Sequence, residues 1–149
     1  MAISTTLRKK IGKPMDPVVF EVEKGSIRRF ANAIGETNPI HQDEAAAKAA
    51  GYASLVAPVT YPCCLQKFEE TLAILDVNTN AIMHAEEEYE YFKPILAGDK
   101  IEITHTLVDA YEKQSPNGLL VFIVIETRGN NKNSKLVFKG RRVLVEFRR

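Results

Sequence analysis

The sequence predicts a single α+β domain over residues 1–149, in which an antiparallel β-sheet wraps around a long central helix. Three observations predict this class. The first half of the chain has apolar residues at helical spacing, the second half has four strand-like segments, and the connections between these segments are short. Short connections join antiparallel neighbours. A helix and a sheet that each have one apolar face bury those faces against each other.

The first half begins with a polar arm and continues with a strand and two helices. Residues 1–17 are predicted as a terminal arm, and the alternating segment Val18–Glu23 as a strand. In Lys24–Ile34 the apolar residues recur at positions i, i+3, i+4 and i+7, which predicts a helix. Asp43–Ala50 begins with an N-cap aspartate and is followed by glycine, so it is predicted as a second, shorter helix.

The longest helix is predicted over about Val59–Asp76. Its apolar residues recur at spacings of four and three: Tyr61, Leu65, Phe68, Leu72 and Leu75. Pro62 is compatible with this helix because it lies in the first turn. The strand candidates that follow are Ile82–Phe92, Lys100–Tyr111, Leu119–Arg128 and Lys135–Phe147. Asn117 and Gly118 form a strong hairpin signal, and we expect the four strands to form a meander.

The composition argues against several classes of protein. A net charge of +1 gives no reason to expect nucleic acid or a membrane surface as a partner. No apolar run approaches the length of a membrane span, and Met1–Lys13 lacks the apolar run of a signal peptide. Cys63 and Cys64 are neighbours, so we expect no disulfide framework, no metal site and a reducing, cytoplasmic compartment.

Gly35–His41 is the segment that is richest in groups able to move protons or hold a polar ligand. It carries an acid, an amide, a proline and an imidazole: Glu36, Asn38, Pro39 and His41. Gly35 tolerates a positive φ, and Asn38 is held extended because it precedes proline. We therefore predict a fixed, irregular loop between two helices, and loops of this kind often carry function.

Three stretches in this order resemble the MaoC-like hydratase and dehydratase family. Its signature is Asp, any residue, Asn, Pro, an aliphatic residue and His, and Glu36–His41 resembles it as Glu-Thr-Asn-Pro-Ile-His. The other two stretches are Leu55–Thr60 and Tyr91–Asp99. The resemblance runs from about Gly12 to the C-terminus. It is greatest to the subclass of N-terminal dehydratase domains, which includes subunits of the mycobacterial hydroxyacyl-thioester dehydratase, and it implies the hot-dog fold.

The resemblance also implies a hydro-lyase of fatty-acid metabolism that needs no cofactor. The expected reaction is reversible addition of water to a trans-2-enoyl thioester, carried on coenzyme A or acyl carrier protein, which gives the (R)-3-hydroxyacyl thioester. Family members work as hot-dog dimers or pseudo-dimers, so we expect a homodimer or a heterodimer with another hot-dog subunit. Their acyl chain lies beside the long helix, where Tyr61 and Phe68 are the acyl-pocket candidates.

The proton-handling candidates are Glu36 and His41. One group must accept a proton while another donates one, and an imidazole is suited to both tasks near neutral pH. The carboxyl group of Glu36, five residues upstream, can share the same water or hydroxyl. By its position in the motif, Asn38 is expected to orient the loop or the histidine.

The chain departs from the family pattern at two positions. Glu36 stands where the family has aspartate, and misplacement of a reacting group by about 1 Å can cost about a hundredfold in rate. The family has His-Gly at the start of the long helix, where the glycine N–H holds the thioester oxygen. This chain has Ala57 and Pro58 there, and proline has no N–H. The oxyanion candidates are therefore the amides of Val59 and Thr60, at a predicted helix N-terminus.

The remaining titratable residues are expected to have structural roles. His84 and His105 are predicted as packed or half-exposed strand residues, and Cys63 and Cys64 as buried ones. The acidic run is predicted as one solvated strand face, with Glu87 as the exception: Glu86, Glu87, Glu88 and Glu90.

Two alternatives to the hydratase remain. In the first alternative, the chain is a non-catalytic acyl-binding subunit, and its hot-dog partner supplies the catalytic pair. The identities of Glu36 and Pro58 motivate this alternative. The second is an acyl-CoA thioesterase of the same fold, against which the Asn-Pro-Ile-His motif argues. Fold alone does not choose between the three functions.

Overall fold

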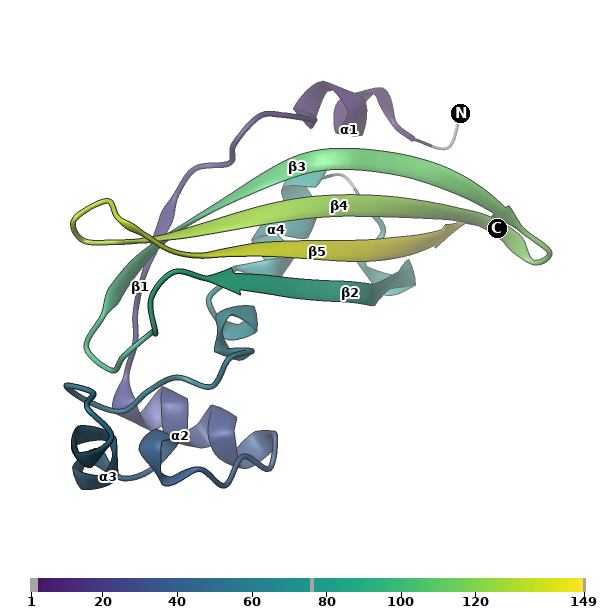
Figure 1. Ribbon diagram of the computed structural model, residues 1–149. Coiled ribbons are helices and arrows are strands. Elements are labelled where there is room, and N and C mark those ends of the chain that lie inside the picture. The colour runs from purple at the N-terminus through teal and green to yellow at the C-terminus, as the bar shows by residue number, and fades with distance from the viewer. Residues whose placement is uncertain (1–2, 76, 149) are drawn as a thin grey trace.

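A five-stranded antiparallel sheet forms the centre of the molecule in the computed structural model, which describes residues 3–75 and 77–148 (Figure 1). In chain order its strands are β1 Val18–Glu21, β2 Ile82–Tyr91, β3 Lys100–Ser115, β4 Gly118–Asn131 and β5 Leu136–Arg148. Across the sheet their order is β1-β3-β4-β5-β2. β3, β4 and β5 form three strands of the predicted meander, and the predicted hairpin between β3 and β4 is confirmed. Its turn residues are Pro116 and Asn117, and Gly118, with φ +143°, is the first residue of β4.

The first strand of the predicted four-stranded meander is placed differently. β2 pairs with β5, and the neighbour of β3 on its free side is β1. The residues between β2 and β3 do not close a hairpin because they bond to another part of the chain. Leu96 forms a bridge with Val56, and the Ile95 carbonyl accepts the Ala57 N–H at 2.8 Å. The connection therefore crosses the end of the sheet.

Four α-helices accompany the sheet in the described parts of the chain: α1 Thr5–Lys10, α2 Lys24–Ala33, α3 Glu44–Ala49 and α4 Phe68–Leu75. Helices α2 and α3 confirm their predictions to within a residue or two at each end, and they lie together beyond the end of the sheet (Figure 1). Helix α1 lies within the predicted polar arm. The Ser4 side chain accepts the Leu7 N–H as its N-cap, and Leu7 is buried.

The single long helix predicted over Val59–Asp76 is wrong. A 3₁₀ turn, η2 (Tyr61–Cys64), and α4 replace it, and the predicted end at Asp76 lies outside the described residues. Leu65 leaves the helical conformation at ψ 62°, and the Gln66 side chain donates to the Cys63 carbonyl. Side-chain capping of this carbonyl takes the place of a helical bond, so the helix ends and restarts.

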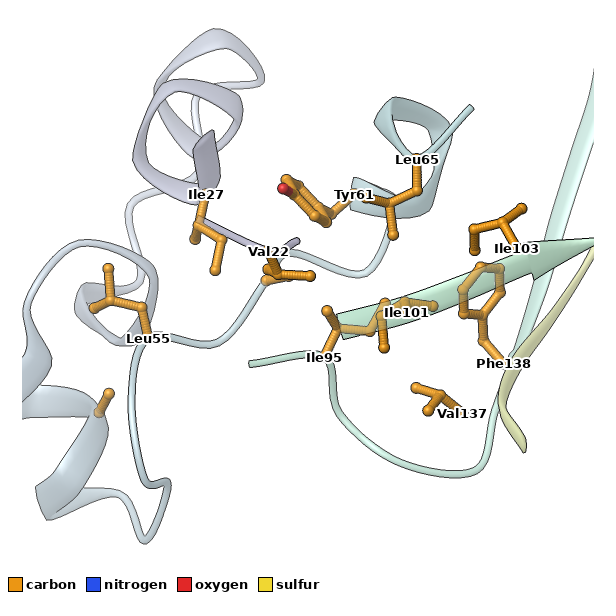
Figure 2. Packing of buried hydrophobic residues seen from close by; sticks show 12 residues of the cluster. Val22, Ile27, Leu55, Tyr61, Leu65, Ile95, Ile101, Ile103, Val137 and Phe138 are labelled. Atoms are coloured by element: carbon orange, nitrogen blue, oxygen red, sulfur yellow. The ribbon is translucent and has the colours of Figure 1, made fainter. Parts of the chain in front are cut away.

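The buried residues form two clusters. The first joins α2, η2 and the Leu55 segment to one end of the sheet (Figure 2): Val22, Ile27, Ala47, Leu55, Ala57, Tyr61, Leu65, Ile95, Ile101, Ile103, Val137 and Phe138. The second joins α1 and α4 to β3, β4 and β5: Ile3, Leu7, Leu72, Leu75, Leu107, Val121, Ile123, Ile125 and Leu144. Both clusters involve the sheet, so the helices are held to it by apolar packing. Among the described residues, every helix is too short or too polar to cross a membrane.

Candidate functional site

The Gly35–His41 loop is built as the sequence predicts. Gly35 has φ +70°, and the next residue begins the loop with its N–H bonded to the Ala31 carbonyl at 2.9 Å. Glu36 is half-buried, and its Oε1 accepts the Asn38 N–H at 2.9 Å. Asn38 in turn uses Oδ1 to accept the Ile40 N–H at 3.2 Å, which caps the 3₁₀ turn η1 (Pro39–His41). These bonds shape the turn that carries His41.

The imidazole of His41 is buried and has a fixed tautomer. Its Nδ1 lies 2.6 Å from the carbonyl oxygen of Val56. A carbonyl oxygen only accepts, so Nδ1 carries the hydrogen, and Nε2 of the neutral ring keeps its lone pair. Nε2 has no hydrogen-bond partner within the described chain. In that same part of the chain, every buried side-chain nitrogen or oxygen has a hydrogen-bond partner. It follows that Nε2 reaches the molecular surface although His41 is 7% exposed.

The segment that holds His41 also leads to the two oxyanion candidates. Val56 bonds to the loop twice, since its N–H donates to the Ile40 carbonyl at 3.1 Å and its own carbonyl accepts from His41. The amides of Val59 and Thr60 follow three and four residues later, and neither has an acceptor among residues 3–75 and 77–148. Val59 uses its carbonyl to accept the Tyr91 hydroxyl at 2.5 Å.

Of the two acyl-pocket candidates, Tyr61 is a core residue. It is 1% exposed in the first cluster (Figure 2). Its ring meets Phe30 edge-on at 5.6 Å, and its hydroxyl donates to Ser26 Oγ at 3.0 Å. Burial raises the pKa of the Tyr61 hydroxyl, and the bond to Ser26 only partly opposes this shift. The side chain of Phe68 lies outside the described part of the structure.

A charged network lies between η2 and strands β2 and β5, and its arginine has no signal in the sequence pattern. Glu87 and Arg142 face each other across the two strands and form a two-pronged ion pair at 2.6 and 2.8 Å. Tyr89 donates to the same carboxylate at 2.6 Å. Burial alone would raise the pKa of Glu87, but these hydrogen bonds outweigh it and hold that pKa below its usual value. Glu86, Glu88 and Glu90 are exposed, which confirms Glu87 as the exception.

The cysteines and the other histidines depart little from their expected roles. Cys63 is half-buried, which raises the pKa of its thiol to about 11, whereas Cys64 is exposed, so its predicted burial is wrong. The two sulfur atoms lie 4.0 Å apart, although only Cys63 is partly covered. His84 is exposed and paired with Glu87 at 2.6 Å, and His105 is half-buried.

Two cavities lie away from the Gly35–His41 loop. One of about 850 Å³ opens at the start of β2, near Asn78 and Glu146, and neither Glu36 nor His41 lines it. The other, of about 180 Å³, lies between α4 and strands β1 and β3. Its walls are mostly apolar and include Phe20 and His105. The proton-handling pair therefore belongs to neither cavity.

Three comparisons relate the chain to known proteins. A family described as "FAS1-like, dehydratase domain region" has a sequence model that matches residues 9–140. A UPF0336 protein of Clavibacter michiganensis subsp. michiganensis is 34% identical over 111 residues, which cover 72% of this chain and 73% of that protein. The truncated HadBC complex of Mycobacterium tuberculosis, a (3R)-hydroxyacyl-ACP dehydratase, contains a chain with 26% identity and a TM-score of 0.79.

The structural likeness covers nearly the whole of both chains. The HadBC match spans 91% of this chain and 96% of the other. The ChsH1-ChsH2 complex of Mycobacterium tuberculosis gives a TM-score of 0.78 at 23% identity, over 98% of this chain and 96% of the other. At 23% identity, the match to the ChsH1-ChsH2 complex supports the fold alone.

Proposed function

Because the chain belongs to the family of the FAS1-like dehydratase domain region, within the MaoC-like dehydratases of the hot-dog fold, we propose that it catalyses reversible hydration of trans-2-enoyl thioesters. The product is the (R)-3-hydroxyacyl thioester, on coenzyme A or acyl carrier protein. The predicted α+β hot-dog class is confirmed by the sheet and by its structural relatives. Family membership supports a hydratase or dehydratase type of function, and the substrate and residue roles are our proposal.

The observation that carries the proposal is the bond from His41 Nδ1 to the Val56 carbonyl. It leaves Nε2 as an accessible base on a buried, immobilised ring. In hydration, Nε2 takes a proton from water while the water oxygen bonds to C3, and it then returns that proton to C2. Glu36 holds the same water with Oε2, since Oε1 is occupied by the Asn38 N–H. Asn38 keeps its proposed orienting role through these bonds.

The thioester oxygen gains negative charge as the water adds, and it needs hydrogen-bond donors. The amide of Val56 is bonded to Ile40 and that of Ala57 to Ile95, while Pro58 has none. Val59 and Thr60 supply the amides that remain open in this part of the described chain. We therefore propose that the oxyanion site has moved one or two residues along the chain from the family position.

The test is hydration of crotonyl-CoA by the purified chain. His41→Ala should lower kcat about 10²–10⁴-fold, as expected when a general acid–base group is removed. His84→Ala is the matched control, because this exposed histidine lies on β2 outside the loop. Activity that survives His41→Ala, or that falls equally in both variants, would eliminate the proposal.

A second function, that of a non-catalytic acyl-binding subunit, is favoured by one specific feature. Pro58 is buried at the position where the family resemblance places an oxyanion donor, and it has no N–H. The names of the HadBC and ChsH1-ChsH2 relatives describe complexes, which fits a chain that works with a second hot-dog subunit. The thioesterase alternative has no comparable support.

A further inference from the structure

The backbone around η2 leaves one carbonyl group without its regular partner. Three N–H groups in this turn or directly after it donate to the carbonyl three residues earlier: Tyr61 to Pro58 at 2.9 Å, Cys63 to Thr60 at 3.1 Å and Leu65 to Pro62 at 3.0 Å. In this pattern the Val59 carbonyl would accept from residue 62. Residue 62 is proline, which has no N–H to donate. The sequence of the turn therefore leaves the Val59 carbonyl open.

Tyr91 occupies this open position from a distant part of the chain. Its hydroxyl donates to the Val59 carbonyl at 2.5 Å, from the last residue of β2. The ring is fixed by its neighbours, with ring centres 6.1 Å from Phe138 and 6.3 Å from Tyr89. Burial raises the pKa of the Tyr91 hydroxyl well above its ordinary value, so the group stays a neutral donor.

The bond at the carbonyl also determines the direction of an amide. Val59 C=O and Thr60 N–H belong to one peptide unit, which is planar and trans, so the two groups point in opposite directions. Because Tyr91 holds the carbonyl, the Thr60 N–H points away from the Tyr91 hydroxyl. A hydrogen bond at the carbonyl also polarises the peptide and strengthens its N–H as a donor. Within the described chain this N–H has no acceptor of its own.

We propose that Tyr91 is a positioning residue, whose hydroxyl holds the Val59–Thr60 peptide so that the Thr60 N–H stabilises the thioester oxygen. The inference rests on the proposed hydratase function. It also chooses between the two oxyanion candidates, because only the Thr60 N–H belongs to the peptide unit that Tyr91 holds. Tyr91 touches no reacting atom and acts through Thr60.

The test compares Tyr91→Phe with Tyr89→Phe in crotonyl-CoA hydration. Tyr89 lies two residues earlier on β2 and also packs on Phe138, but its hydroxyl donates to Glu87, so it is the matched control. Tyr91→Phe should lower kcat about 10–100-fold and leave KM within about twofold, because an oxyanion donor acts chiefly on the transition state. Tyr89→Phe should keep kcat near the wild-type value.

A second variant separates positioning from general damage. Pro62→Ala gives residue 62 an N–H that can donate to the Val59 carbonyl, so it should restore part of the kcat lost in Tyr91→Phe. The Thr60 amide resonance, measured by NMR without substrate, should move in Tyr91→Phe, return toward wild type in the double variant and stay unchanged in Tyr89→Phe.

The outcomes distinguish the two proposals. A wild-type chain without hydratase activity, or one whose activity survives His41→Ala, overturns the proposed function and with it the catalytic role of Tyr91. An active chain in which Tyr91→Phe matches Tyr89→Phe, or in which only KM changes, overturns the positioning role alone. A loss of kcat in Tyr91→Phe without a shift of the Thr60 resonance also overturns it, because the effect would then not pass through that peptide.

Discussion

His105 shows how the surroundings of a single side chain change its chemistry. It lies half-buried on β3, where Nδ1 is 2.9 Å from Thr127 Oγ1, and it forms part of the wall of the cavity beside α4. Burial lowers the pKa of this imidazole to about 4, and the nearby Arg142 guanidinium acts in the same direction. The folded protein therefore keeps His105 neutral over a range where an unfolded chain protonates it.

This difference predicts a pH dependence of stability. Below pH 6.5 the unfolded chain binds a proton at His105 that the folded chain refuses until about pH 4, so acidification through this range favours unfolding. The contribution is at most about 1.4 kcal/mol per pH unit. His105→Gln should remove it, so the stability of the variant should fall less between pH 6.5 and about 4.

Urea midpoints of both proteins across that range measure the effect. The stability of the variant need not equal that of the wild type at pH 7, because the comparison concerns the slope of stability against pH. Parallel slopes for the two proteins would contradict the origin of the effect at His105.

At the scale of the elements, helix α1 depends on contacts outside itself. It has six residues, too few for an isolated helix to be stable in water. Leu7 is 1% exposed and belongs to the second cluster, together with Leu72 and Leu75 of α4. Packing of this side chain, with the Ser4 cap, accounts for a helix where the sequence indicates an arm.

The contribution of this packing is measurable. Leu7→Ala should lower the free energy of unfolding by about 2–5 kcal/mol, because it removes a buried side chain and leaves a cavity. Ile11→Ala, directly after the helix, is the control, since Ile11 is 37% exposed and its truncation should cost less than about 1 kcal/mol. Chemical denaturation of the two variants gives the comparison. Equal losses would mean that α1 is not held by Leu7.

At the scale of the whole molecule, the two edges of the sheet differ. β1 is a short edge of four residues, whereas β2 is an edge of ten. A long edge strand presents unpaired N–H and C=O groups along its free side. Met83 on β2 is 57% exposed and Phe92, directly after it, is 49% exposed. These features favour assembly with a second hot-dog chain along β2.

We expect the purified chain to associate, either with itself or with another hot-dog subunit. Met83→Lys should weaken this association, whereas Val19→Lys, an equally exposed site on the β1 edge, should leave it intact. Light scattering coupled to gel filtration gives the mass. An active homodimer supports the hydratase, and activity that requires a co-expressed partner supports the non-catalytic subunit. A fully active monomer would contradict both forms of assembly.

The sequence alone determines most of the elements and the loop that carries the candidate pair. Strand alternation, the helical spacing in Lys24–Ile34, the Asp43 cap and the hairpin signal near Asn117 are local patterns, and the structure confirms each of them. The grouping of Glu36, Asn38 and His41 is also local, since one short loop carries all three. Local patterns reach only a few residues along the chain, and these features need no more than that.

Tertiary structure alone decides which distant groups meet. It places β2 beside β5, divides the predicted long helix and brings Arg142 to Glu87. It also joins His41 to Val56 and Tyr91 to Val59. These contacts depend on the path of the chain between their partners, and the periodicity of apolar residues in the sequence does not predict that path. The tautomer of His41 and the direction of the Thr60 amide are therefore properties of the folded molecule, because each is set by a partner that only folding brings near.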